Sequence, residues 1–239
     1  MPLAKRVAAS GRYSRREAQK LIEAGRVTVN GKTVLVPGGP VAVSDDVRLD
    51  GNPLLAQPFR YVVLNKPAGY VSTLRDPQGR RTVVSLLPDV GVKLKPAGRL
   101  DFDTEGLLLF TNDGELAFRL THPRFGVEKE YEVVVRGLLT EESRRKLTRG
   151  VTLEDGRSAP ARILRVEADP RRQRSSFRLV IHQGRKRLIR RMCEAVGHPV
   201  LALKRVRIGR VVLRRLPTGC CRILGKAEVG ALRRAVGLD

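Results

Sequence analysis

A proline-containing break between residues 51 and 60 divides this chain into two parts. The stretch reads Gly-Asn-Pro-Leu-Leu-Ala-Gln-Pro-Phe-Arg, and Pro53 and Pro58 prevent it from forming a regular helix. The chain has 239 residues, a length between one large domain and two modest ones. We therefore expect a small N-terminal domain over residues 1–50, a linker over residues 51–60 and a larger domain over residues 61–239.

The first fifty residues contain the signals of one compact unit. Ser14 and Glu17 have the spacing of a capping box, which predicts the start of a helix. Gly25 is placed to end that helix in a left-handed conformation. An Asn-Gly pair flanked by short β-prone runs follows, and it predicts a hairpin over residues 27–34.

The chain has a large excess of positive charge, with 47 Lys and Arg against 24 Asp and Glu and a net charge of +23. Residues 171–215 alone hold 15 basic side chains and a single acid, Glu194. This excess indicates a polyanionic partner, and nucleic acid is the leading candidate because phosphate neutralisation releases counterions. An anionic membrane surface is the alternative, but it favours an amphipathic helix with exposed aromatic residues, and only 4% of this chain is aromatic.

Four cations gather around the N-terminal half of the first predicted helix, namely Arg12, Arg15, Arg16 and Lys20. The helix dipole disfavours positive charge there, which suggests a use for it, although charge alone is equally consistent with a solvated basic face. Residues 3–50 resemble the S4 RNA-binding domain, whose pattern runs from a Leu-Ala opening through a Ser-Arg-Arg-Glu-Ala helix to a Gly-Arg-Val-x-Val-Asn-Gly hairpin. The resemblance implies that the four cations contact RNA phosphates.

The rest of the chain mixes strand-like and helix-like runs without a regular βαβ period. The predicted strands are Tyr61–Leu64, Leu107–Thr111, Glu130–Val135, Phe177–His182 and Leu203–Leu213. The predicted helices are Glu115–Leu120, Glu141–Leu147, Lys186–Val196 and Ala227–Val236. Apolar alternation, as in residues 177–181, is typical of half-buried antiparallel strands. The expected fold class is therefore α+β, with a mixed, mainly antiparallel sheet flanked by helices.

Three acids in five residues stand between glycines in the segment 98–114. A calcium loop is one interpretation, because Asp101, Asp103 and Glu105 hold the first, third and fifth positions of an EF-hand. Asn112 occupies the position where that loop needs a bidentate Glu, which argues against calcium. A catalytic carboxylate on a loop before a buried strand is a second interpretation, and an aspartate that only caps backbone N–H groups is a third. The residues alone leave Asp101 open between these last two roles.

The same segment resembles the active-site motif of the RsuA/RluB group of pseudouridine synthases, with Gly98-Arg99-Leu100-Asp101 followed by Asp103-Thr104-Glu105-Gly106-Leu107-Leu108. Further matches cover most of residues 61–239. They are Lys66-Pro67-Ala68-Gly69, Lys129-Glu130-Tyr131 and Gly184-Arg185-Lys186-Arg187-Leu188-Ile189-Arg190-Arg191-Met192. The resemblance implies a pseudouridine synthase domain in which Asp101 is the catalytic carboxylate, Tyr131 stacks on the target base and Arg190 pairs with Asp101.

The cationic members of these motifs are expected to bind RNA, namely Arg99, Arg185, Lys186, Arg187 and Arg191. One position departs from the pattern, because Leu188 stands where this group usually has Gln, which affects a secondary polar contact. An S4 domain ahead of the synthase domain, together with the segment Gly197–Gly209, is closest to the RluB-like branch, which acts on large-subunit (23S) rRNA. The RsuA branch, which acts on small-subunit (16S) rRNA, is the near alternative.

The implied reaction isomerises a uridine to pseudouridine, which needs no electrons and no group donor, so we expect no cofactor and no metal. The expected partner is ribosomal RNA or a ribosomal assembly intermediate, bound by a monomer. The chain shows neither a membrane-spanning run nor a secretory leader, so we expect a cytoplasmic protein. A non-catalytic RNA-binding or ribosome-assembly protein is the main rival, and a metal-dependent nuclease a distant one. RNA binding alone does not require Asp101, Tyr131 and Arg190 together, and a synthase, unlike such a nuclease, should stay active in excess chelator.

Overall fold

The chain divides into two compact units, each with its own buried apolar core, in a computed structural model that describes residues 1–238. One unit comprises residues 1–60 together with 89–94, and the other comprises residues 61–88 together with the chain from residue 95 onward. Each core holds apolar side chains from both helices and strands of its own unit.

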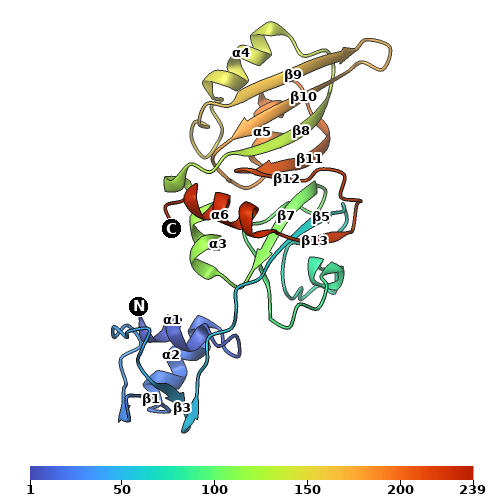
Figure 1. The fold of residues 1–239 in the computed structure, drawn as a ribbon. Coiled ribbons are helices and arrows are strands. Elements are labelled where there is room, and N and C mark those ends of the chain that lie inside the picture. Colours follow the sequence, from blue (N-terminus) through green and yellow to red (C-terminus); the bar gives the residue numbers. More distant parts are fainter. Residues whose placement is uncertain (239) are drawn as a thin grey trace. The chain divides into compact units, whose positions relative to one another are not determined.

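The N-terminal unit packs two helices on a small antiparallel sheet (Figure 1). Its elements are α1 (Leu3–Ala8), α2 (Arg15–Glu23), β1 (Val27–Val29), β2 (Lys32–Thr33), β3 (Val47–Leu49) and β4 (Asn52–Pro53), with strand order β2-β1-β3-β4. Leu3, Val7, Ile22 and Val27 are fully buried in its core. The small sheet and two helices therefore form a closed core without a contribution from the synthase-like motifs.

The local signals in this unit act as predicted. The backbone N–H of Glu17 donates to the Ser14 hydroxyl at 3.2 Å, and the backbone N–H of Ser14 donates to the Glu17 carboxylate at 2.6 Å. Gly25 follows α2 with a φ of +70°, the left-handed region that glycine favours. Strands β1 and β2 pair antiparallel on either side of the Asn-Gly turn. The predicted helix and hairpin are thus confirmed.

The larger unit is built on a nine-stranded sheet whose path is β13-β5-β7-β11-β8-β10-β9, with β6 on β7 and β12 on β11. The strands are β5 (Tyr61–Lys66), β6 (Lys95–Pro96), β7 (Glu105–Thr111), β8 (Lys129–Arg136), β9 (Arg162–Asp169), β10 (Arg174–Ile181), β11 (Val200–Ile208), β12 (Val211–Val212) and β13 (Cys221–Ile223). Only β7 and β11 pair in parallel among the described strands. The expected α+β class with a mixed, mainly antiparallel sheet is confirmed.

The helices of this unit pack against the sheet and against each other (Figure 1). They are the α-helices α3 (Gly114–Thr121), α4 (Glu141–Arg149), α5 (Leu188–Ala195) and α6 (Lys226–Arg234), and the short 3-10 helices η1 (Val83–Leu86) and η2 (Pro123–Phe125). Helix α3 contacts α6, α4 contacts β9, and α5 contacts β11. Leu107 and Leu109 of β7 share one core with Leu116 of α3 and Leu232 of α6.

Two predicted elements differ from the observed ones, and three strands of the larger unit, β6, β9 and β13, were not predicted. The helix predicted over 186–196 begins only at Leu188, because Arg187 adopts a left-handed φ of +48° at the N-cap. The strand predicted over 203–213 is two strands, β11 and β12, separated by a turn. Strand β9 carries a mostly exposed face with little apolar alternation, so its pattern gave no strand signal.

Strand β7 approaches β11 closely at Gly106, directly after the acidic loop. Gly106 has a φ of +102°, and a Cβ atom there would lie 2.2 Å from the carbonyl oxygen of Arg205. Only glycine fits at this crossing. The close approach brings the loop before β7 next to the side chains of β11. No helix within residues 1–238 is long and apolar enough to span a membrane.

Candidate active site

A buried lysine at the end of β5 holds the loop that carries Asp101. Lys66, at the end of β5, is fully buried, and its ammonium donates hydrogen bonds to the carbonyl oxygens of Thr104 at 2.8 Å, Asp101 at 3.1 Å and Phe102 at 3.4 Å. Burial lowers the pKa of Lys66 to about 8, against the opposing effect of the nearby acids. A single cation thus fixes the backbone of residues 101–104.

Further hydrogen bonds hold the same loop from the turn after β5. The Ser72 hydroxyl donates to the carbonyl oxygen of Leu100 at 2.8 Å and accepts from its N–H at 3.1 Å. The N–H of Gly69 donates to the carbonyl oxygen of Phe102 at 2.8 Å. The Lys-Pro-x-Gly turn matched in the sequence therefore serves as the support of the acidic loop.

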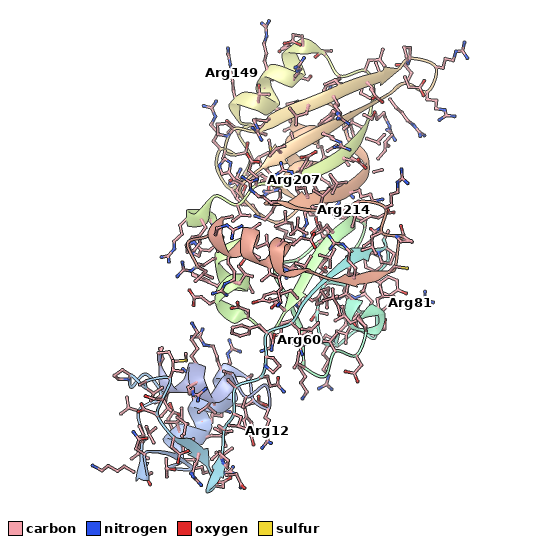
Figure 2. The ribbon with its side chains drawn as sticks, viewed as in Figure 1. Arg12, Arg60, Arg81, Arg149, Arg207 and Arg214 are labelled. Carbon is pink, nitrogen blue, oxygen red and sulfur yellow. The ribbon has the colours of Figure 1, made fainter. Side chains whose placement is uncertain are left out.

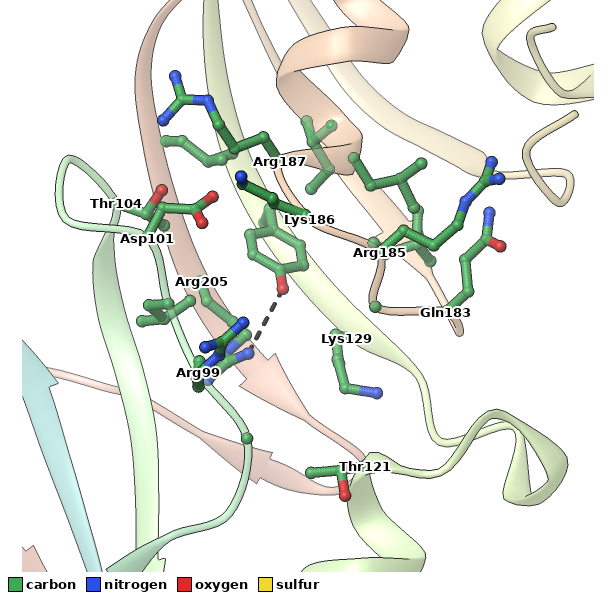
Figure 3. Close-up of a pocket in the computed structure, with 18 of the residues that line it drawn as sticks. Arg99, Asp101, Thr104, Thr121, Lys129, Gln183, Arg185, Lys186, Arg187 and Arg205 are labelled. Carbon is green, nitrogen blue, oxygen red and sulfur yellow. Dashed lines mark hydrogen bonds between the residues drawn. The ribbon is translucent and has the colours of Figure 1, made fainter. Parts of the chain in front are cut away.

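Asp101 projects from this loop into a pocket of about 260 Å³ (Figure 3). The pocket wall includes Tyr131 and Lys129 from β8, Arg205 from β11 and the turn at residues 183–187 before α5. Within residues 1–238 the Asp101 carboxylate accepts no hydrogen bond and forms no ion pair, whereas the main-chain carbonyl of Asp101 accepts from Lys66 and from the N–H of Thr104. A carboxylate held on a rigid backbone, with its oxygens open to a pocket, can act as a nucleophile or a base.

The structure corrects the expected partner of Arg190. Its guanidinium lies 3.2 Å from the carboxylate of Asp103 and donates to the carbonyl oxygen of Asp103 at 3.0 Å, and the pair expected with Asp101 does not form. Arg187 also contacts Asp103, with both of its terminal nitrogens 3.3 Å from the carboxylate oxygens. Asp103 therefore takes both cations, which leaves the carboxylate of Asp101 open to the pocket.

Tyr131 forms the pocket wall together with two buried cations. Its side chain is only 8% exposed, and its hydroxyl accepts a hydrogen bond of 3.4 Å from Arg205, drawn as the dashed line in Figure 3. The Arg205 guanidinium lies 6.0 Å from the centre of the Tyr131 ring. Lys129, two residues earlier on β8, is equally buried and lines the same pocket. Burial, assisted by Arg205, lowers the pKa of Lys129 to about 8.

The predicted RNA-binding cations of the third motif fall into two groups. Lys186 and Arg187 are exposed at the pocket, as is Arg99. Arg185 and Arg191 are instead held by Asp155, at 3.3 and 2.8 Å, and the hydrogen bonds from Arg191 lower the pKa of that carboxyl. These two arginines brace the loop before residue 157 against the start of α5.

The four cations predicted to bind RNA in the N-terminal unit, Arg12, Arg15, Arg16 and Lys20, all have exposed side chains. They lie in and just before α2, whose N-terminus is capped by the Ser14–Glu17 pair. Arginine side chains extend from both units, among them Arg12 before α2 and Arg149 on α4 (Figure 2). Both units therefore offer positive charge to solvent.

The sequence interpretation missed the roles of Lys66, Lys129 and Arg205. Lys66 and Lys129 stand in matched motifs, and the alternation of β8 already places Lys129 on the same face as Tyr131. Arg205 stood unremarked among the basic residues of the C-terminal segment. Their burial depends on contacts between distant segments, and lysine and arginine are almost never fully buried, so no local pattern indicated it.

Comparisons with known proteins agree with this arrangement. Residues 60–195 match the family model described as RNA pseudouridylate synthase, and residues 1–47 match the S4 domain. The chain is 43% identical to the ribosomal large subunit pseudouridine synthase B of Bacillus subtilis, over 97% of this chain and 95% of that protein. It is 42% identical to an uncharacterized RNA pseudouridine synthase of Aquifex aeolicus, over 96% of this chain and 92% of that protein.

A solved structure described as a pseudouridylate synthase superimposes with a TM-score of 0.69 at 30% identity, covering 97% of this chain and 99% of that one. The family model covers more than half of the chain, including the loop of Asp101, the strand of Tyr131 and all of α5. The resemblance inferred from the motifs is thereby confirmed. The chain belongs to the RNA pseudouridylate synthase family and carries an S4 domain at its N-terminal end.

Proposed function

We propose that this protein isomerises a specific uridine of large-subunit (23S) ribosomal RNA to pseudouridine, with Asp101 as the catalytic carboxylate. The observation that carries the proposal is the carboxylate of Asp101, which has no protein partner within residues 1–238 and faces a pocket lined by Tyr131. The near full-length identity to a large-subunit synthase favours the 23S substrate. The small-subunit (16S) substrate is the alternative within the same chemistry.

In this reaction the bond between N1 of uracil and C1′ of the ribose breaks, the base turns, and C5 bonds to C1′. C5 then loses its proton and N1 gains one. Asp101 begins the reaction by attacking C1′, by attacking the base or by removing the C2′ proton, and each route starts from the same ionised carboxylate. Tyr131 packs against the uracil. Arg190 acts on the loop through Asp103, which it contacts at 3.0 Å, rather than on Asp101 itself.

The target uridine must leave its stack to reach this pocket, at a cost of a few kcal/mol. We assign the offsetting RNA contacts to the exposed cations Arg99, Lys186 and Arg187 around the pocket and to the basic cluster of the S4 domain. In this proposal the unit of residues 1–60 and 89–94, whose sheet and core include β4 and Leu54 of the expected linker, anchors the RNA. The other unit holds the catalytic site. The protein acts as a monomer on ribosomal RNA or an assembly intermediate in the cytoplasm.

The test of the substrate uses large- and small-subunit rRNA transcripts labelled with tritium at C5 of uridine. Only rejoining through C5 releases the label, so release from the large-subunit transcript, with excess EDTA present, is the expected result. Release from the small-subunit transcript alone would move the protein to the other branch. RNA binding without release from either transcript or from assembly intermediates would support the non-catalytic rival.

A further inference from the structure

Lys129 and Arg205 form a pair of buried cations in the pocket wall without an acidic partner. Their exposed fractions are 8% and 3%. Within residues 1–238 neither has a carboxylate at ion-pair distance. The ammonium of Lys129 donates only to the carbonyl oxygen of Val127 at 3.1 Å. The Nη2 of Arg205 is buried and has no hydrogen-bond partner among the described residues.

On the opposite face of the same strands, a buried charged residue has ion-pair partners. Glu130, between Lys129 and Tyr131, is also 8% exposed, and it pairs with Arg178 at 3.2 Å and Arg207 at 2.8 Å. A bulge in β11 between Arg205 and Arg207 sends the two arginines to opposite faces. Glu130, the acid next in sequence to Lys129, therefore lies on the opposite face of the sheet. On the pocket face of β8 and β11, Lys129 and Arg205 have no carboxylate at ion-pair distance among the described residues.

A buried cation without an anionic partner destabilises the folded protein, and a negative group that binds beside it offsets this desolvation penalty. The pair lines the pocket that contains Asp101, so a group that enters beside Asp101 meets it. From this placement we propose that Lys129 and Arg205 form a binding site for an anionic oxygen of the RNA substrate. This inference rests on the proposed function and names a contact of the same site.

The negatively charged oxygen can come from two parts of the substrate, the uracil base or a backbone phosphate. When the N1–C1′ bond breaks, both electrons leave with the base, and the negative charge spreads from N1 onto the uracil carbonyl oxygens until C5 bonds to C1′. The C5 proton then leaves and N1 takes up a proton. Attack on the base at C6 instead places the electron pair on the C4 carbonyl oxygen as an enolate. The other source is a backbone phosphate next to the flipped uridine. Donors aimed at developing charge act on the rate at saturation, whereas a phosphate contact acts on binding.

The first experiment compares Lys129→Met, Lys129→Arg and the exposed control Lys226→Met in single-turnover reactions on the labelled transcript. If the ligand is a uracil oxygen, Lys129→Met should lower the rate at saturating protein by about 100-fold. The protein concentration that gives half the maximal rate should change little. Lys129→Arg keeps the charge and recovers most of the rate, and Lys226→Met matches the wild type. If the ligand is a phosphate, Lys129→Met should raise the protein concentration that gives half the maximal rate and leave the maximal rate unchanged.

A transcript with 5-fluorouridine at the target separates the same two sources. Fluorine withdraws electrons and makes the departing base a weaker base, so it needs less help from a cation. With a uracil oxygen as ligand, the deficit of Lys129→Met in consumption of the target nucleoside shrinks to under about 10-fold. With a phosphate as ligand, the deficit keeps its size. A variant equal to the wild type on both transcripts would overturn the proposal.

A readout independent of the reaction keeps the anion site distinct from the proposed function. Inorganic phosphate is the probe, and the measurement is the rise in melting temperature that it causes in wild type, Lys129→Met and Lys226→Met. The account expects a smaller rise in Lys129→Met than in the other two proteins. Wild type without tritium release but with this difference would refute the proposed function and keep the anion site. An equal rise in all three proteins, together with unchanged rates, would refute the site.

Discussion

The ammonium of Lys66 donates a 2.8 Å hydrogen bond to the carbonyl oxygen of Thr104, across the two strands that flank the active-site loop. Lys66 ends β5, and Thr104 immediately precedes β7, which pairs antiparallel with β5. The same ammonium also reaches the carbonyl oxygen of Asp101. The position of the catalytic carboxylate is thus tied to a buried cation on the neighbouring strand.

Replacing Lys66 with Met should loosen this loop. The variant removes the lysine donor of the buried Thr104 carbonyl oxygen, so we expect the unfolding free energy to fall by about 1–3 kcal/mol relative to the wild type. Because the loop positions Asp101, tritium release should slow by about 10–100-fold. Equal stability and an equal rate in the variant would show that the lysine does not support the loop.

The pH dependence of stability gives a second prediction for Lys66. In the folded protein the pKa of Lys66 is about 8, below the ordinary lysine value of 10.5 that applies to the unfolded chain. Between these values the unfolded chain binds more protons, so Lys66 makes a contribution to the unfolding free energy that rises with pH. Lys66→Met lacks this contribution, and the gap between wild type and variant should widen from pH 7 to pH 9.5. A gap that stays constant over this window would contradict the lowered pKa.

Gly106→Ala tests the close crossing of β7 and β11. The new Cβ atom would lie 2.2 Å from the Arg205 carbonyl oxygen at a backbone φ of +102°, so we expect a loss of about 3 kcal/mol or more. Gly114→Ala is the matched control, because no atom lies within 4 Å of its added Cβ. Denaturant unfolding of both variants measures the difference. A Gly106→Ala protein as stable as Gly114→Ala would be incompatible with the described approach of the strands.

The basic cluster of the S4 domain should affect binding rather than chemistry. Changing Arg12, Arg15, Arg16 and Lys20 together to Ala removes four charges while it keeps the capping pair of α2. We expect weaker RNA binding, and the slope of log binding constant against log salt concentration should become about three units shallower. The rate at saturating RNA should not change. A matched variant exchanges Arg for Lys and Lys for Arg at these positions and should retain the salt slope. An unchanged slope in the Ala variant would remove the cluster from the RNA interface.

The sequence was most informative where structure depends on near neighbours. The Ser14–Glu17 cap, the left-handed Gly25 and the apolar alternation of residues 177–181 each follow from residues a few positions apart, and the structure has them as predicted. Motif resemblance added Asp101, which no spacing rule separates from a capping aspartate.

Local sequence patterns could not predict the contacts between distant segments. Arg190 could meet either Asp101 or Asp103, and the choice depends on how α5 docks beside the loop. The bulge that separates Arg205 from Arg207 reverses the face that strict alternation would assign. The fully buried cation Lys66 violates the usual preference of lysine for solvent. Each of these features is fixed by tertiary packing rather than by local pattern.

The most direct test of the central claim compares Asp101→Asn with Asp103→Asn in the tritium-release assay. Both variants remove one negative charge from the same loop, but only Asp101 has a carboxylate open to the pocket, whereas Asp103 is held by Arg187 and Arg190. The account predicts that Asp101→Asn binds the transcript and releases no tritium, while Asp103→Asn keeps measurable activity. Release by Asp101→Asn at the wild-type rate would contradict the assignment of Asp101 as the catalytic carboxylate.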